Sequence, residues 1–247
     1  MRPNRKRVVS LVPSLTEAVA VSAPGLLVGV TDWCTHPATG LAGVSRIGGT
    51  KNPDVRAIAA LRPDLVIANE EENRAPDLAE LRAAGVEVLV TEVRGLPQAL
   101  SELDRVLVGA LGLARPGWLT DAEAAWARVE PDAERRAFVP IWRRPWMVLG
   151  RDTFAGDLLA RLGVRNVYAG HAERYPRVAP AELAELAAAG CDLVVLPDEP
   201  YRFTAEDGPE AFPGLPAALV SGRHLTWYGP SLAQAPAVLS RALRGAG

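Results

Sequence analysis

The sequence has few cysteines and histidines and no long apolar run. Its 247 residues include two cysteines, Cys34 and Cys191, and three histidines. The two cysteines are so far apart that a disulfide would have to join distant parts of the chain, so we expect free thiols in a reducing compartment. No segment is long and apolar enough to span a bilayer, which excludes a membrane-spanning helix.

Motifs of several large enzyme classes are also absent. The chain contains no GxSxG elbow, no GxxxxGK[ST] phosphate loop, no HExxH zinc motif and no dinucleotide-binding fingerprint. The histidines His36, His171 and His224 fall in different expected loops, and none has a nucleophile at a suggestive spacing. We therefore expect a non-catalytic protein with no catalytic residues and no intrinsic cofactor.

Outside the first residues, acidic residues outnumber basic ones. The chain has 27 Lys and Arg residues against 29 Asp and Glu residues, and its only concentrated basic group lies between Arg2 and Arg7. Because the rest of the chain is acidic, we expect no nucleic-acid partner. Polar residues between Pro13 and Glu17 interrupt the apolar stretch that follows the basic group, unlike a secretion signal. We expect a cytoplasmic protein as written, and an extracytoplasmic one if the true N-terminus is longer.

Two similar stretches organise the chain, DLVIANEEEN at 64–73 and DLVVLPDEPY at 192–201. Each is a short apolar run that begins at an Asp and ends at carboxylates, a pattern typical of a strand buried on both faces of a parallel sheet. The two stretches begin 128 residues apart, about the size of one domain. The sequence therefore predicts two α/β lobes.

Expected strands and helices alternate in both halves, as in parallel βα units. Ser14 with Glu17 three residues later has the spacing of a capping box, and Asp54 and Thr153 precede further helices. The segments FVPIW at 138–142 and RRPWMVLG at 143–150 predict a pair of short strands around a turn at 143–145. Sustained helical spacing from Pro97 predicts a helical connection, so we expect lobes at 1–96 and 137–247 joined by helix at 97–136.

Several segments together resemble the class III substrate-binding proteins for cobalamin and ferric siderophores, also called helical backbone metal receptors. The similar segments are RVVSLVPSLTEAV, VGVTDWCTHP, LRPDLVIA, LGVRNVY, CDLVVLPDEPYRF and LTWYGPSLAQAPAVLSRAL. The resemblance implies two Rossmann-like α/β lobes joined by a long backbone helix, with a ligand cleft between the lobes. It implies a metal-chelate ligand, for which a corrinoid such as cobalamin is our first expectation and a ferric siderophore or haem the alternatives.

The resemblance also implies a partner, the permease of an ABC importer, and we expect the binding protein itself to be a monomer. Such receptors carry one glutamate at the tip of each lobe, which pairs with permease arginines. Glu182 occupies approximately that place in the second lobe, whereas the comparable position in the first lobe is Arg56. A reversed charge there would oppose docking on an arginine pocket.

Aromatic residues in expected loops are candidates for contact with the chelate, because Trp and Tyr offer rigid π surfaces. The candidate ligand-binding residues are Trp33, Trp146, Tyr201, Phe203, Arg223, Trp227 and Tyr228. Arg223, like Arg143 and Arg144, could pair with a carboxylate or phosphate of the ligand. The alternative is that each aromatic residue packs in the core of its own lobe and that the arginines are solvated.

Cys34 and His36 are the only cysteine and histidine close together, and a thiolate with an imidazole suits zinc, copper or cobalt. No third or fourth ligand lies nearby in the sequence, so a buried thiol and a hydrogen-bonded imidazole remain the alternative. If the pair does bind metal, the second functional hypothesis is a cytosolic metallochaperone or cofactor-handling enzyme.

Overall fold

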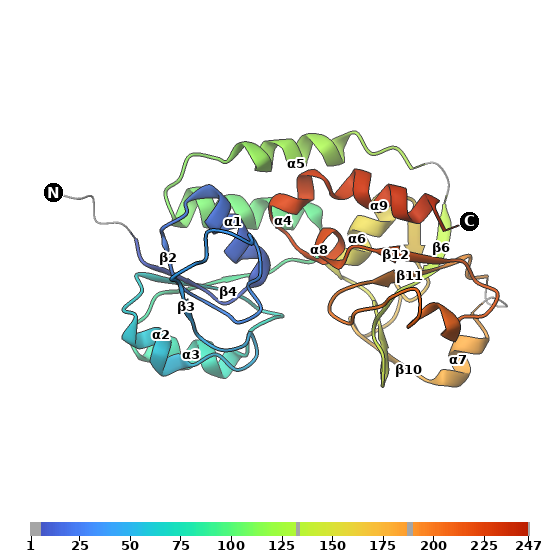
Figure 1. Cartoon of the computed structure of the whole chain (residues 1–247), viewed down its shortest axis with the longest axis horizontal. Coiled ribbons are helices and arrows are strands. Elements are labelled where there is room, and N and C mark those ends of the chain that lie inside the picture. The colour runs from blue at the N-terminus through green and yellow to red at the C-terminus, as the bar shows by residue number, and fades with distance from the viewer. Residues whose placement is uncertain (1–5, 132–133, 187–189, 247) are drawn as a thin grey trace. The chain divides into compact units, whose positions relative to one another are not determined.

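The computed structural model describes residues 6–131, 134–186 and 190–246, and the chain forms two compact units (Figure 1). Unit 1 consists of Met1–Val93, Pro97–Thr120 and Tyr228–Pro230, and unit 2 of Arg94–Leu96, Asp121–Trp227 and Ser231–Gly247. The segment Tyr228–Pro230 therefore returns to unit 1 late in the sequence.

Unit 1 is built on a five-stranded sheet in the order β3-β2-β1-β4-β5, and all of its strand pairs are parallel. Its strands are β1 (Val8–Ser10), β2 (Leu27–Val30), β3 (Ser45–Arg46), β4 (Leu65–Asn69) and β5 (Val88–Thr91). Every residue of β4 is buried, which confirms the prediction for the first repeated stretch.

Helices lie on both sides of this sheet, with α1 on one side and α2 and α3 on the other (Figure 1). The helices are α1 (Pro13–Ser22), α2 (Val55–Ala60), α3 (Ala75–Ala83) and α4 (Leu96–Asp104), which continues into a π-helical turn, η1 (Arg105–Ala110). Asp54 caps α2, since its side chain accepts a hydrogen bond from the Ala57 N–H. The capping box expected at Ser14 is wrong: α1 begins at Pro13, and Ser14 and Glu17 are both buried.

Unit 2 contains a four-stranded parallel sheet in the order β12-β11-β6-β9 and a three-stranded antiparallel sheet in the order β10-β8-β7. The strands of the parallel sheet are β6 (Arg135–Phe138), β9 (Val164–Asn166), β11 (Leu193–Pro197) and β12 (Ala217–Val220). Those of the antiparallel sheet are β7 (Pro140–Trp142), β8 (Trp146–Val148) and β10 (Arg177–Val178). The expected pair of short strands is confirmed as the β7–β8 hairpin.

The helices of unit 2 are short except for α9. They are α6 (Phe154–Arg161), α7 (Pro180–Ala184), α8 (Gly222–Thr226) and α9 (Ala235–Arg244), with 3-10 turns at η2 (Pro209–Ala211) and η3 (Pro230–Ala233). Thr153 caps α6 as expected, its hydroxyl accepting from the Gly156 N–H. A further helix, α5 (Gly117–Ala127), contributes residues to both units.

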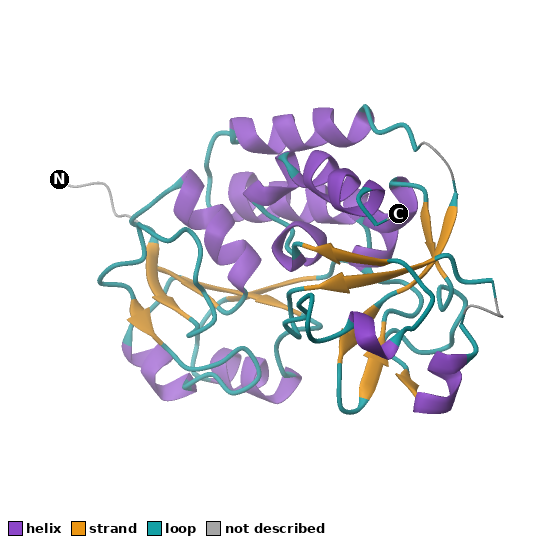
Figure 2. Ribbon diagram, turned by 45° about the vertical axis from the view of Figure 1, so that its right-hand side comes forward, coloured by secondary structure: helices purple, strands orange, loops and turns teal. Residues whose placement is uncertain are grey.

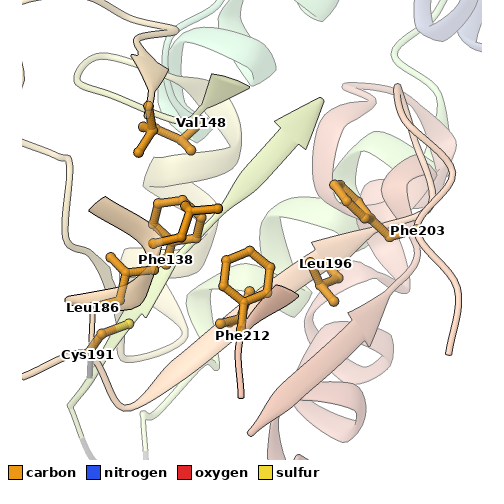
Figure 3. Close-up of a cluster of buried hydrophobic side chains, with 10 residues drawn as sticks. Phe138, Val148, Leu186, Cys191, Leu196, Phe203 and Phe212 are labelled. Carbon is orange, nitrogen blue, oxygen red and sulfur yellow. The ribbon is translucent and has the colours of Figure 1, made fainter. Parts of the chain in front are cut away.

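The core of unit 2 is rich in aromatic rings. Phe138 of β6 packs against Phe212, with ring centroids 5.4 Å apart, and Leu196 of β11 lies in the same buried cluster (Figure 3). Phe203, which follows β11, belongs to this cluster and is only 3% exposed. The loop after β11 is thereby fixed onto the core.

Asp64 and Asp192, the first residues of the two repeated stretches, make the same pair of backbone contacts in the two units. The Arg7 N–H donates to Oδ2 of Asp64 (2.7 Å), and the Asp64 N–H donates to the Arg7 carbonyl (2.8 Å). In unit 2 the Arg136 N–H donates to Oδ2 of Asp192 (2.8 Å), and the Asp192 N–H donates to the Arg136 carbonyl (2.8 Å). Each aspartate therefore ties the start of its strand to a neighbouring strand.

Figure 2 distinguishes the helices, strands and loops of the described residues by colour. Within the described part of the chain, no helix has the length and apolar character needed to cross a membrane.

Replacing either aspartate by alanine should destabilise the protein by about 1–2 kcal/mol, because a charge-assisted bond to a strand N–H is lost. Urea denaturation of Asp64→Ala and Asp192→Ala measures this change. Asp64→Asn and Asp192→Asn keep an acceptor oxygen and should lose less, and Asp121→Ala, at an exposed position of α5, is the control. Equal stability of the alanine variants and the control would contradict the role assigned to this contact.

Candidate functional site

Polar and aromatic loops follow the carboxyl ends of the strands in both parallel sheets. In unit 1 they include residues 31–36 after β2 and residues 70–73 after β4. In unit 2 they include the β7–β8 hairpin after β6, residues 198–203 after β11 and helix α8 after β12. Ligands of open α/β sheets bind at this edge, so we take these loops as the candidate functional site.

Two asparagines that the sequence analysis did not single out shape the loop after β4. Asn69 donates to the Thr91 carbonyl (3.1 Å), and its Oδ1 accepts from the N–H groups of Glu71 (2.9 Å) and Glu72 (3.3 Å). Asn73 Nδ2 donates to the Leu11 carbonyl (3.2 Å), and its Oδ1 accepts from the Asn69 N–H. In the sequence, the spacing of four residues between these asparagines could have indicated that they bond to each other.

Glu72 and Tyr228 meet inside unit 1. The Tyr228 hydroxyl donates to Oε1 of Glu72 (3.4 Å), and Tyr228 is 6% exposed. Burial raises the pKa of Glu72 to about 7, and the charge of Glu71 adds to this rise while the Tyr228 hydrogen bond and Lys51 oppose it. Tyr228, expected to contact ligand, is thus a buried residue whose hydroxyl is bonded to a carboxyl group that changes charge near neutral pH.

The two residues expected to bind metal, Cys34 and His36, both lie on the loop after β2 but differ in burial. Cys34 is fully buried, its Sγ lies 3.1 Å from the hydroxyl oxygens of Thr16 and Thr31, and burial raises the pKa of its thiol. His36 is half-buried, with Nδ1 3.1 Å from the Thr35 hydroxyl. Among the described residues, no group of three or more His, Cys, Asp or Glu side chains could hold a metal ion. The assignment of Cys34 and His36 as metal ligands stays a prediction.

Trp33 differs from its neighbour Cys34 in being 66% exposed. Arg46 holds the backbone of this loop, since its Nη1 donates to the carbonyls of Thr31 (2.8 Å) and Cys34 (3.0 Å). An exposed indole on a braced loop is available to a ligand at little entropic cost.

In unit 2 the structure brings Trp146, Tyr201 and Phe203 together. The rings of Trp146 and Phe203 are stacked (centroids 6.1 Å apart), and those of Tyr201 and Phe203 lie 4.7 Å apart. Phe203 is buried, whereas Trp146 and Tyr201 are half-buried. Phe203 therefore supports the other two rings from the core.

Arg223 lies in helix α8, and Trp227 directly follows the last residue of this helix. The Trp227 Nε1 donates to Oε2 of Glu199 (2.8 Å), and Trp227 is 9% exposed. The Gly222 N–H donates to Asp198 (2.6 Å), and a Cβ at Gly222 would lie 2.6 Å from the Glu199 backbone nitrogen. Glycine at this position is what allows α8 to approach the loop after β11 so closely. Arg223 is half-buried on this helix.

The two residues expected at the permease interface lie on helices of different units. Arg56 is exposed on α2. Glu182 is exposed on α7, where its carboxylate accepts from the Ala179 N–H (2.9 Å) and the Tyr168 hydroxyl (3.3 Å). Burial, with the charge of Glu182, raises the pKa of Tyr168. Contact of Arg56 and Glu182 with a permease stays a prediction.

Two α/β units, each with a parallel sheet whose strands are followed by aromatic and polar loops, are typical of two-lobed binding proteins. The sequence matches the family described as periplasmic binding protein over residues 8–195, and the chain belongs to this family.

The chain is also similar to curated proteins. It is 27% identical over 179 residues to the ABC transporter substrate-binding lipoprotein YvrC of Bacillus subtilis, covering 66% of this chain and 56% of that protein. It is 23% identical over 177 residues to a vitamin B12-binding protein of Salmonella choleraesuis, covering 70% of this chain and 66% of that protein. The matches thus span less than two thirds of the length of these relatives.

Solved structures extend the similarity to nearly the whole chain. The periplasmic heme-binding protein RhuT from Roseiflexus sp. RS-1 has a TM-score of 0.79 at 24% identity, with 98% of this chain and 99% of that chain covered. The vitamin B12-binding protein BtuF of Vibrio cholerae has a TM-score of 0.72 at 18% identity, with 98% and 97% covered. These structures confirm the predicted two-lobe α/β fold, and the named relatives are binding proteins, in agreement with the expectation of a non-enzyme.

Glu72→Gln should make unfolding less dependent on pH. A carboxyl group whose pKa is raised on folding stabilises the folded state most when it is protonated, and this contribution falls as pH rises from about 4.5 to about 7. Allowing for partial exposure, the variant should be more stable than the wild type by about 1–3 kcal/mol at pH 8 and similar at pH 5.

Urea denaturation at pH 5, 6, 7 and 8 measures this difference. Glu80→Gln, which removes an exposed carboxylate of α3, is the control and should follow the wild type. A constant difference between Glu72→Gln and wild type over this pH range would contradict the burial of an ionisable Glu72.

Proposed function

We propose that the protein is a non-catalytic receptor that binds a metal chelate at the carboxyl edges of its two parallel sheets. The observation that carries the proposal is an exposed tryptophan in each unit: Trp33, on the loop after β2, is 66% exposed, and Trp142, the last residue of β7, is 42% exposed. Trp and Tyr are enriched at interfaces, where one end of the side chain is buried and the other stays solvated. Flat chelates offer such rings a broad apolar face.

The ligand we propose first is a corrinoid such as cobalamin, with haem and ferric siderophores as alternatives. Relatives whose names specify vitamin B12 or heme binding support this range. We also propose delivery to an ABC permease, which the name of the Bacillus subtilis relative supports. The cytoplasmic location and the monomeric state stay predictions.

Titration of the purified protein with cobalamin, haem and a ferric siderophore should quench tryptophan fluorescence for at least one of these chelates. Trp33→Ala should raise the dissociation constant of that chelate by about tenfold, the effect of losing one good aromatic contact. Trp118→Phe changes a helix α5 tryptophan bonded to Ser22 and should leave the affinity unchanged.

Absence of binding by all three chelates would contradict the proposal. Binding of zinc or cobalt ions that is lost in a Cys34→Ala, His36→Ala variant would instead favour the metallochaperone hypothesis.

A further inference from the structure

The segment Tyr228–Pro230, here called the latch segment, packs in unit 1 although the residues on both sides of it belong to unit 2. Tyr228 is 6% exposed, and its hydroxyl donates to Oε1 of Glu72 (3.4 Å), 156 residues away in the sequence. Gly229 is buried against the first turn of α1, where a Cβ on this residue would lie 3.0 Å from the Ser14 carbonyl oxygen. One side-chain hydrogen bond and one close backbone approach thus hold the latch segment on unit 1.

The carboxyl group of Glu72 receives few hydrogen bonds. The backbone N–H groups of Glu71 and Glu72 donate to Oδ1 of Asn69 (2.9 and 3.3 Å) and not to this carboxyl group. Among the described residues, the Tyr228 hydroxyl is the one hydrogen-bond donor to it. An ionised carboxylate has about four acceptor sites and is costly to remove from water unless donors fill them. With one donor, the docked arrangement therefore favours a protonated Glu72.

Charged groups near Glu72 come from its own loop and from two neighbouring elements. Lys51, in the loop before α2, donates to the Glu71 carbonyl, and its charge favours an ionised Glu72, whereas the charge of Glu71 opposes ionisation. Oε2 of Glu17, on α1, is 3.9 Å from the place that a Cβ of the latch glycine would take. Burial is the largest influence and raises the pKa of Glu72 to about 7. Burial also raises the pKa of the Tyr228 hydroxyl, which therefore remains a donor near neutral pH.

We propose that Glu72 is a proton-controlled switch for the latch segment: protonated Glu72 keeps Tyr228–Pro230 docked on unit 1, and ionisation of Glu72 releases it. Release exposes the carboxylate to water, which supplies the donors that the docked arrangement lacks. Binding of a proton to Glu72 and docking of the latch segment therefore stabilise each other. This inference does not depend on which ligand the protein binds.

Proton linkage sets the direction and the size of the effect. Glu72 has a pKa of about 7 with the latch segment docked, and on release its pKa should return towards the ordinary value of 4.5. The ratio of released to docked protein should thus be lowest at pH 5, rise with pH and level off above about pH 7. Between pH 6 and pH 8 full linkage gives a rise of about tenfold, and we expect roughly 3- to 10-fold because Glu72 is half-buried.

NMR of protein labelled with 13C in the tyrosine rings and in the glutamate carboxyl groups follows both events. The chain has four tyrosines, of which the other three lie in unit 2 and serve as internal references, and Tyr228→Phe assigns the Tyr228 signal. In the wild type this signal should move towards that of free tyrosine between pH 5 and pH 8, in parallel with the titration of Glu72. Relaxation dispersion measures the released fraction where it is small.

Glu72→Gln should keep the Tyr228 signal at its docked position over this pH range, because the neutral amide cannot ionise. Glu80→Gln, which removes an exposed carboxylate of α3, is the matched control and should follow the wild type. Gly229→Ala tests the geometry without changing a charge. Its Cβ would press on the Ser14 carbonyl oxygen, so the released fraction should exceed that of the wild type at every pH and still rise with pH.

Ionisation of Glu72 with the Tyr228 signal unchanged would overturn this inference, and so would a pH-dependent Tyr228 signal that persists in Glu72→Gln. Loss of the folded signals of β4 together with that of Tyr228 would also overturn it, because unit 1 would then unfold as a whole and the latch segment would not open separately.

Discussion

Asp64 and Asp192 set the alignment of the strands on which both candidate site loops depend. Each carboxylate accepts a bond from an N–H just before or at the start of the neighbouring strand, and the two contacts match to within 0.1 Å, at 2.7 and 2.8 Å. Side chains alternate between the two faces of a sheet, so a slip of one residue would exchange the faces of β4 or β11. It would also displace the loops at 70–73 and 198–203. The aspartates therefore act at the amino ends of the strands and position residues that follow the carboxyl ends.

Much of the fold could be predicted from the sequence because its signals are local. Buried apolar runs identified β4 and β11, and side-chain caps identified the starts of α2 and α6. The capping box at Ser14 failed because both of its residues are buried in unit 1, and the helix begins at Pro13 instead. Sequence spacing does not show whether a polar side chain near a helix start faces solvent or the interior.

The candidate site was harder to predict because it depends on contacts between distant residues. Phe203 and Tyr201 are two residues apart, yet Phe203 is in a core formed with Phe138 and Phe212, and Tyr201 is half-buried. Trp142 and Trp146 both flank the hairpin turn, but Trp146 packs on that core and Trp142 does not. No pattern in the sequence around Tyr228 indicates that this residue packs in unit 1 and bonds to Glu72. Trp33 and Trp142 are the two tryptophans among the exposed large hydrophobic side chains of the described residues, and core packing does not explain their positions.

The central claim is that a metal chelate binds at the carboxyl edges of the sheets. Anomalous X-ray scattering at the cobalt or iron absorption edge, from crystals grown with cobalamin or haem, locates the metal directly. Our account predicts a metal peak in a chelate whose ring lies against Trp33 or Trp142. A metal bound by Cys34 and His36, or a chelate at the amino ends of the strands, would contradict it.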